Sequence, residues 1–160
     1  MNGIVRGPVE FGLRVTYRLR WLAPLLMRLF LGYFFLETGW GKIHNLSAFT
    51  QRFMAWGIPY PAFNAALSAY TEFFGGALTI AGLFMRPVSI AMIINMAVAI
   101  ISVKFKDVHT LSDFAELDEP LYALGFFWLM MWGPGAVSLD YFIERVLNLP
   151  KWSESTPDRS

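Results

Sequence analysis

Three charged side chains lie inside stretches of sequence that otherwise have the composition of membrane-spanning helices. Arg28 and Glu37 lie between Trp21 and Trp40, and Glu72 lies in the segment 62–84. A charged side chain at the centre of a bilayer costs roughly 2.5 to 3.5 kcal/mol even on lenient scales, so such residues usually face inward and are paired. These residues therefore predict a polar site inside a helical bundle, able to pair ions, carry a proton or bind a polar headgroup.

The depth of each polar residue follows from the helical rise. Measured from the cytoplasmic end, Arg28 lies roughly 10 Å deep, Asn95 about 12 Å and Glu72 about 18 Å. An arginine side chain bridges several ångströms by snorkelling, so we expect these three residues to meet in one network. Glu37, about 24 Å deep, is expected nearer the outer surface, within reach of three polar residues: Lys42, Tyr122 and Glu119.

Two interpretations of a pair between Arg28 and Glu72 stay open at this point. In the first, a buried ion pair fixes the register of two helices and has no chemical role. In the second, the pair lines a cavity that binds a polar headgroup or carries a proton.

The composition indicates that much of the surface of this protein contacts membrane lipid. Of its 160 residues, 56% are hydrophobic and only 16% are charged, and the mean hydropathy is +0.45. A soluble domain has about 25% charged residues. We therefore predict an all-α integral membrane protein, folded as one four-helix bundle. The net charge of +1 gives no reason to expect nucleic-acid binding.

Four apolar segments are long enough, at about 20 residues each, to cross a bilayer. Together they predict a transmembrane domain over 21–139, with helices at about 21–40, 62–84, 87–103 and 120–137. In the first loop, apolar residues at helical spacing predict a short interfacial helix: Phe49, Phe53, Met54 and Trp56.

The two ends of the chain are polar. Residues 1–20 form a basic N-terminal arm, whose alternating apolar residues suit a strand while its arginines suit an interfacial helix; both remain open. Residues 140–160 are expected to form a polar tail. Lysine and arginine number eight on the side of the termini and four on the other side, which predicts cytoplasmic termini.

Several kinds of chemistry are excluded or left unassigned by the sequence. With no cysteine, the chain has no disulfide, thiolate metal site or iron–sulfur ligand of its own. His44 and His109 lie in loops outside the predicted helices, so a bis-histidine haem inside the bundle is excluded. No metal site is predicted, although metal binding by these two histidines stays open. No catalytic residue is assigned, and whether the chain is an enzyme is undecided.

Glycines follow Glu72 by one helical turn. Gly75 and Gly76 predict close packing of two membrane helices, as small residues commonly allow. The alternative is that they make room beside Glu72 for a flat ring ligand.

In their order and spacing, these residues resemble the DoxX family of small bacterial membrane proteins. The similarity reads Arg28-x3-Gly32-x2-Phe35-x3-Gly39-x2-Lys42, then Phe53, Gly57, Pro59 and Pro61, then Glu72-x2-Gly75-Gly76, Gly82 and Arg86, and more loosely Asn95, Ala97, Gly133-Pro134-Gly135, Ser138 and Asp140. The resemblance implies a four-helix protein of the bacterial inner membrane. It also implies a link to quinones, because relatives accompany quinol oxidases and thiosulfate–quinone oxidoreductases. Four positions carry over from the family: Arg28, Lys42, Glu72 and Arg86.

Three functions are compatible with these observations. The first is an accessory subunit of a quinone-linked or redox-stress oxidoreductase complex, which binds quinone or lipid headgroups near Arg28 and Glu72 and depends on a redox partner protein for electrons. The second is a non-catalytic membrane anchor that recruits soluble partners. The third is a small transporter, which four helices form only as a homo-oligomer.

Overall fold

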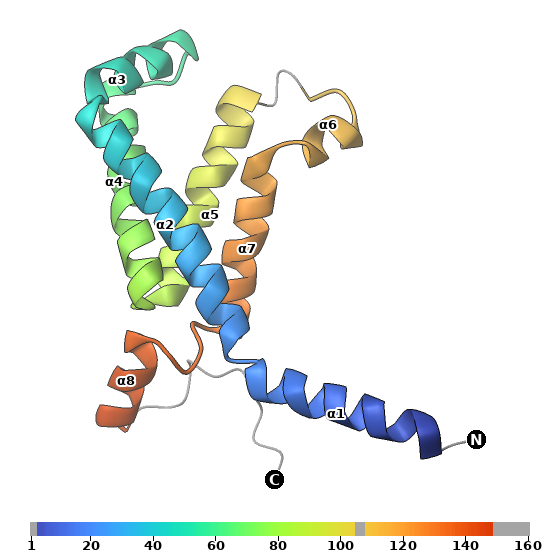
Figure 1. Cartoon of the computed structure of the whole chain (residues 1–160). Coiled ribbons are helices and arrows are strands. Elements are labelled where there is room, and N and C mark those ends of the chain that lie inside the picture. Colours follow the sequence, from blue (N-terminus) through green and yellow to red (C-terminus); the bar gives the residue numbers. More distant parts are fainter. Residues whose placement is uncertain (1–2, 105–107, 149–160) are drawn as a thin grey trace.

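Helices make up nearly all of the structure, a computed structural model that describes residues 3–104 and 108–148 (Figure 1). In chain order they are α1 (Gly3–Leu19), α2 (Leu22–His44), α3 (Leu46–Ala55), α4 (Pro61–Ala81), α5 (Met85–Ala99), the π-helical η1 (Ile100–Lys104), α6 (Leu111–Ala115), α7 (Asp118–Trp132) and α8 (Leu139–Val146). No strand occurs in the described ranges, and the predicted all-α class is confirmed there.

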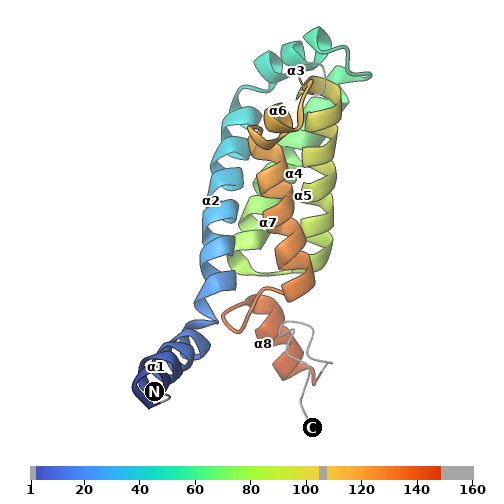
Figure 2. The same ribbon diagram turned by 90° about the vertical axis from the view of Figure 1, so that its right-hand side faces the viewer.

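The four long helices α2, α4, α5 and α7 lie side by side and form the bundle (Figures 1 and 2). They correspond to the four predicted segments. However, the described ranges hold eight α-helices, so a four-helix description covers the bundle alone. From their joint at residues 82–84, α4 and α5 diverge toward the end of the bundle that carries α3 and α6 (Figure 1).

Glycines with positive φ end two of the bundle helices. Gly82 ends α4 with φ +65°, and Gly133 ends α7 with φ +91°. Positive φ is favourable for glycine because it has no Cβ. The last helix therefore stops five residues before the predicted end at residue 137. The first runs four residues beyond its predicted end, to His44.

Helices α2 and α4 approach so closely that side chains do not fit between them. A Cβ on Gly76 would lie 2.7 Å from the carbonyl oxygen of Gly32, and a Cβ on Gly39 would lie 2.7 Å from the Cα of Phe73. Gly75 faces α5 instead, where a Cβ would lie 2.6 Å from the sulfur of Met92. The adjacent glycines thus serve two helix interfaces, and the space beside Gly75 is filled by Met92 and not left for a ring ligand.

Two apolar cores stabilise this arrangement. The main core joins α2, α5 and α7 through Leu31, Phe35, Met85, Val88, Met92, Met96, Phe126 and Leu129. A smaller core packs α3 onto α4 through Phe49, Phe53, Ala65 and Ala69. The short helix expected in the first loop is therefore present as α3, with Phe49 and Phe53 buried and Met54 exposed.

Within residues 3–104 and 108–148, two helices are long and apolar enough to cross a membrane. By length and composition these are Leu22–His44, with hydropathy 1.2, and Met85–Val103, with hydropathy 1.8. Only 33% and 22% of their apolar windows are buried. Most of their apolar surface thus faces outward, where lipid would cover it.

The terminal segments differ from a simple arm and tail. The N-terminal arm is helical as α1, so the strand interpretation is wrong, and α1 extends away from the bundle (Figure 1). The predicted polar tail begins with α8, which the sequence analysis did not predict. The remainder of that tail, residues 149–160, lies outside the described residues.

Candidate functional site

The carboxylate of Glu72 is the centre of a polar cluster inside the bundle. The Lys42 ammonium group lies 2.5 Å from each of its oxygens. The Asn95 amide donates to Oε1 at 3.1 Å, and the Thr38 hydroxyl donates to Oε2 at 3.3 Å. Glu72 is buried, whereas the side chain of Lys42 is 30% exposed. Three helices, α2, α4 and α5, thus converge on one carboxylate.

The close crossing of α2 and α4 brings this cluster together. Thr38 and Lys42 are four residues apart on α2, so they lie on the same face one turn apart. Gly39 lies between them, against the main chain of Glu72 and Phe73. With no side chain at Gly39, the ammonium group reaches the carboxylate directly. Lys42 also lies over the ring of Phe49, 5.1 Å from its centroid.

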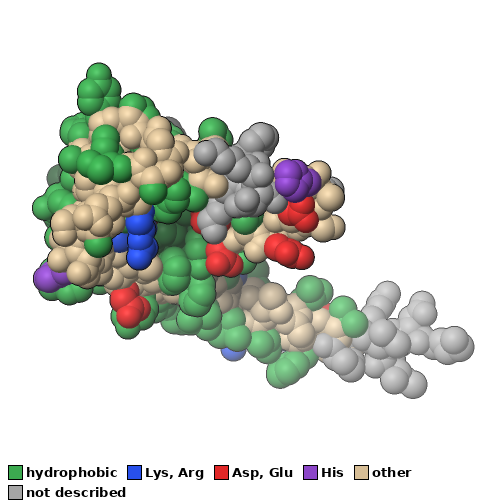
Figure 3. Space-filling view, turned by 90° about the horizontal axis from the view of Figure 1, so that it is seen from above, with side chains coloured by type: hydrophobic (Ala, Val, Ile, Leu, Met, Phe, Trp, Pro, Cys, Tyr) green, Lys and Arg blue, Asp and Glu red, His purple; other side chains and the backbone are tan. Residues whose placement is uncertain are grey.

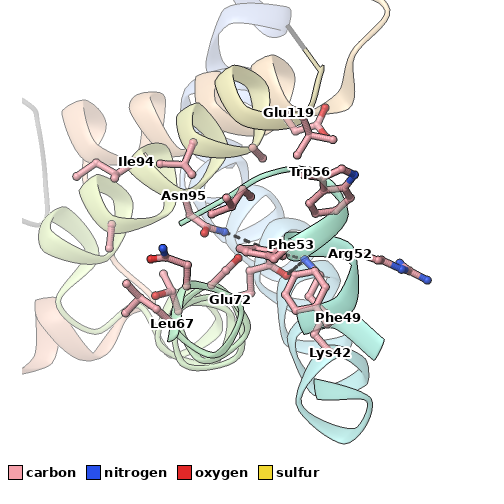
Figure 4. A pocket seen from close by; sticks show the side chains of 18 of the residues that line it. Lys42, Phe49, Arg52, Phe53, Trp56, Leu67, Glu72, Ile94, Asn95 and Glu119 are labelled. Atoms are coloured by element: carbon pink, nitrogen blue, oxygen red, sulfur yellow. Dashed lines mark hydrogen bonds and ion pairs between the residues drawn. The ribbon is translucent and has the colours of Figure 1, made fainter. Parts of the chain in front are cut away.

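A cavity of about 730 Å³ adjoins the cluster, between α4 and α5 and beside α3. Figure 4 shows Lys42, Glu72 and Asn95 on one part of its lining, facing aromatic and aliphatic side chains. The apolar lining comes from Phe49, Phe53, Trp56, Ile58, Leu67, Ile94 and Val98. Ligand sites in proteins combine such an apolar lining with a few convergent polar groups, in volumes of roughly 300 to 1,000 Å³.

The surface near the cavity carries charge of both signs. Arg52 on α3 and Glu119 on α7 both line the cavity. Figure 3 views the molecule from the α3 end and shows a hollow with basic side chains on one side and carboxylates on the other. A polar row on α4, formed by Asn64, Ser68 and Thr71, connects this end with Glu72.

The predicted network of Arg28, Asn95 and Glu72 is wrong as far as Arg28 is concerned. The buried guanidinium donates four hydrogen bonds of 2.7 to 3.0 Å to main-chain oxygens, those of Thr79, Ile80, Pro134 and Val137. Thr79 lies seven residues after Glu72, about 10 Å further along α4. Arg28 therefore stabilises the opposite end of the bundle. There it shares the carbonyl of Thr79 with the main-chain nitrogen of Gly82, and it satisfies three further carbonyls at the end of α4 and in the turn after α7.

Further contacts at this end join α4, α5 and α8. The Asp140 carboxylate accepts hydrogen bonds from the main-chain nitrogens of Phe84 and Met85, at 2.8 and 2.9 Å. Its own nitrogen donates to the carbonyl of Gly82. Asp140 thus places a negative charge at the N-terminus of α5, where a helix dipole favours it.

The DoxX family model matches residues 23–105. This range is more than half of the chain and contains α2 to α5 with every member of the Glu72 cluster. The chain belongs to the DoxX family. No match was found among curated proteins or among solved structures.

Membership of the DoxX family shows that this is a membrane protein. The outward apolar surfaces of α2 and α5 therefore face membrane lipid.

The family positions named from the sequence lie in different parts of the structure. Lys42 and Glu72 form the cluster, and Gly32, Phe35, Gly39, Gly75 and Gly76 pack helices. Gly57 makes the turn after α3 with φ +74°, Pro59 lines the cavity, and Arg86 lies in the first turn of α5.

Glu37 does not lie in the cluster of this DoxX protein. It is exposed on α2, and within the described ranges it makes no hydrogen bond or ion pair. Each partner expected for it lies elsewhere. Lys42 contacts Glu72, Tyr122 packs against the rings of Phe34 and Phe35, and Glu119 lines the cavity.

Thr38 is the one cluster member that the sequence analysis missed. Its spacing of four residues from Lys42 was a usable signal, since it places both side chains on one helical face. The two histidines contribute nothing to the cluster. The ring of His44 lies against that of Trp40 at an interplanar angle of 49°. The described residues contain no group of three or more potential ligands around a metal position.

Proposed function

We propose that this chain is an accessory subunit of a quinone-linked or redox-stress oxidoreductase complex in the bacterial inner membrane. The observation that supports the proposal most is the cavity of about 730 Å³, with Lys42, Glu72 and Asn95 on one side and an apolar lining on the other. A quinone has the matching division between a polar ring and an apolar tail.

The polar groups suit the two oxygens of a quinone ring. A quinone carbonyl only accepts hydrogen bonds, and the Lys42 ammonium and the Asn95 amide are both donors. When bound, a quinone supplies two-electron, two-proton redox chemistry. With a quinone bound, Lys42 would favour negative charge on a nearby ring oxygen, and the Glu72 carboxylate would accept or return a proton. Both groups are already oriented by the contacts between them.

The walls of the cavity also suit an apolar tail. Leu67, Ile94 and Val98 line the cavity, yet they are 53%, 57% and 47% exposed. The opening between α4 and α5 therefore has apolar edges that reach the outer surface of the bundle. A tail leaving the cavity there passes directly into lipid.

The electrons come from a partner protein in this proposal. The sequence has no cysteine, His44 is the last residue of α2 with its ring against Trp40, and His109 precedes α6, so a flavin, haem or metal centre is assigned to the partner. The excess of basic residues near the termini favours cytoplasmic termini. In that orientation the cavity and α3 lie toward the outer side of the membrane.

Quinone binding by the purified protein tests the proposal. A short-chain quinone quenches tryptophan fluorescence, and Trp56 lines the cavity. We expect Lys42→Met to weaken binding about tenfold to a hundredfold, because it removes one charge-assisted contact of roughly 1.5 to 3 kcal/mol. Glu72→Gln should weaken binding as well, because it removes the carboxylate that holds the Lys42 ammonium in place. Glu37→Gln is the matched control, because it removes a carboxylate that lies outside the cavity. Unchanged binding by folded Glu72→Gln protein would end the proposal.

The second candidate function is a membrane anchor that recruits soluble partners. It is favoured by α1, whose described side chains are all exposed and which extends away from the bundle (Figure 1). In that case the Lys42–Glu72 pair only stabilises the fold. Exchanging the two residues (Lys42→Glu with Glu72→Lys) would then restore normal abundance and full function. Restored abundance without quinone binding favours the binding site instead.

A further inference from the structure

A row of exposed side chains follows α2 on the side that faces away from the bundle. We call it the α2 outer stripe, and its members are Leu26, Phe30, Tyr33, Glu37, Trp40 and His44. They alternate at spacings of four and three residues. This seven-residue repeat is the pattern that lets a second helix pack along the first.

Among the described helices, α4 touches this stripe near one end, where the rings of Trp40 and Phe73 lie 5.6 Å apart; most of the stripe is not covered. In Figure 2, α2 forms one edge of the bundle and no other described element lies on its outer side. The large side chains are strongly exposed, with Phe30 at 67% and Tyr33 at 63%. Lipid alone would be a suitable surrounding for these residues, but not for Glu37.

Glu37 lies too deep to count as a surface residue. It precedes the end of α2 at His44 by seven residues, which corresponds to about 10 Å along the helix axis. Ionisable groups at membrane depth are almost always turned inward and given a partner. Within the described ranges Glu37 has neither, whereas Glu72 has three donors.

Charge complementarity determines which partner fits. Of the basic side chains of α2, Arg28 is bound to four carbonyls and Lys42 to Glu72. The remaining basic residue of α2, His44, lies about 10 Å further along the helix than Glu37. In two copies with the same membrane orientation, Glu37 would therefore face Glu37 and not a cation. We infer that the α2 outer stripe binds a transmembrane helix of a different protein, and that this helix carries a lysine or arginine opposite Glu37.

Photo-crosslinking in native membranes tests this inference. A photoreactive phenylalanine analogue at Tyr33, one turn from Glu37, is compared with the same analogue at Tyr70. Tyr70 is the matched control, a tyrosine near the middle of α4 that is 45% exposed. We expect position 33 to crosslink to an integral membrane protein, at a transmembrane segment that contains Lys or Arg. Position 70 should not give this product.

Substitution of Glu37 then tests the role of charge. Polar contacts between membrane helices contribute modestly, so Glu37→Gln should lower the yield of the position 33 product about threefold to thirtyfold. Glu37→Lys should abolish it, and reversing the partner's cation to Glu should restore it. Crosslinks only to lipid or to a second copy, or equal yields from Glu37→Gln, would overturn the inference. Quinone binding by purified Glu37→Gln protein stays normal in either case, which separates this test from that of the cavity.

Discussion

The ammonium nitrogen of Lys42 lies 2.5 Å from each carboxylate oxygen of Glu72, a residue 30 positions later in the chain. One buried acid and one partly exposed base thus connect the first and second helices of the bundle. The consequences for stability and for ligand binding can be separated by substitution.

Replacing Lys42 alone should lower the free energy of unfolding more than replacing both Lys42 and Glu72. Lys42→Met leaves Glu72 buried without its cation, and we expect a loss of about 2 kcal/mol in the free energy of unfolding. Fully buried pairs lose roughly 3 to 5 kcal/mol, but Lys42 is nearly one-third exposed. The double variant Lys42→Met with Glu72→Gln should regain most of the loss. Thermal unfolding in detergent measures both; equal losses in the two variants would contradict an ion pair.

Adding a side chain to a glycine at the contact between α2 and α4 should destabilise the protein. Gly39→Ala and Gly76→Ala each place a Cβ against the main chain of the facing helix, so we expect losses of about 2 kcal/mol or more from overpacking. Gly41→Ala is the control on the same helix, because nothing lies within 4 Å of its Cβ position. It should be neutral or slightly stabilising, as helix propensity predicts. Similar unfolding midpoints for all three variants would refute the close approach.

Arg28 should act on stability and not on ligand binding. Arg28→Met leaves three carbonyls without a donor, while that of Thr79 keeps the main-chain nitrogen of Gly82. At roughly 1 to 3 kcal/mol for an unsatisfied buried group, we expect a loss of about 3 kcal/mol or more in the free energy of unfolding. Arg28→Lys should recover only part, because an ammonium lacks the planar fork of the guanidinium. Quinone affinity of the surviving folded protein should match that of the wild type. A loss of quinone affinity in folded Arg28→Met protein would instead indicate that Arg28 contributes to the binding site.

The short helix α6, outside the bundle helices, should depend on pH. Hydrogen bonds from the main-chain nitrogen of His109, and from Thr110, hold the pKa of Asp113 below its ordinary value of 3.8. Since the folded pKa is lowered, its contribution is complete above that value and is lost as the pH falls through the folded pKa. Amide exchange in α6 should therefore accelerate only in strongly acidic solution. In Asp113→Asn this acid-dependent acceleration should be absent.

The positions of the bundle helices could be predicted because apolar runs and their glycine and proline boundaries are local properties. The predicted ends of these helices were less accurate, and one error affected the candidate site. Placing the end of the first helix at Trp40 left Lys42 in a loop. In the structure α2 continues to His44, and one more turn brings Lys42 onto the face that carries Thr38.

The partners of Arg28 could not be predicted from side-chain types. All four acceptors are main-chain carbonyls, which every residue carries and no sequence pattern distinguishes. Depth along the helix gave Arg28 and Glu72 comparable positions. The direction of each side chain depends on how α2 and α4 cross, and that crossing is determined by glycine contacts between distant segments.

Two of the four acceptors of Arg28 lie beyond the region that the DoxX family model matches. The carbonyls of Pro134 and Val137 are 106 and 109 residues away in sequence. During synthesis, the first bundle helix is therefore complete long before its guanidinium can be fully satisfied. Assembly of this end must wait for the final segment to leave the ribosome. A chain truncated before Pro134 would leave the guanidinium with only its two acceptors on α4, Thr79 and Ile80.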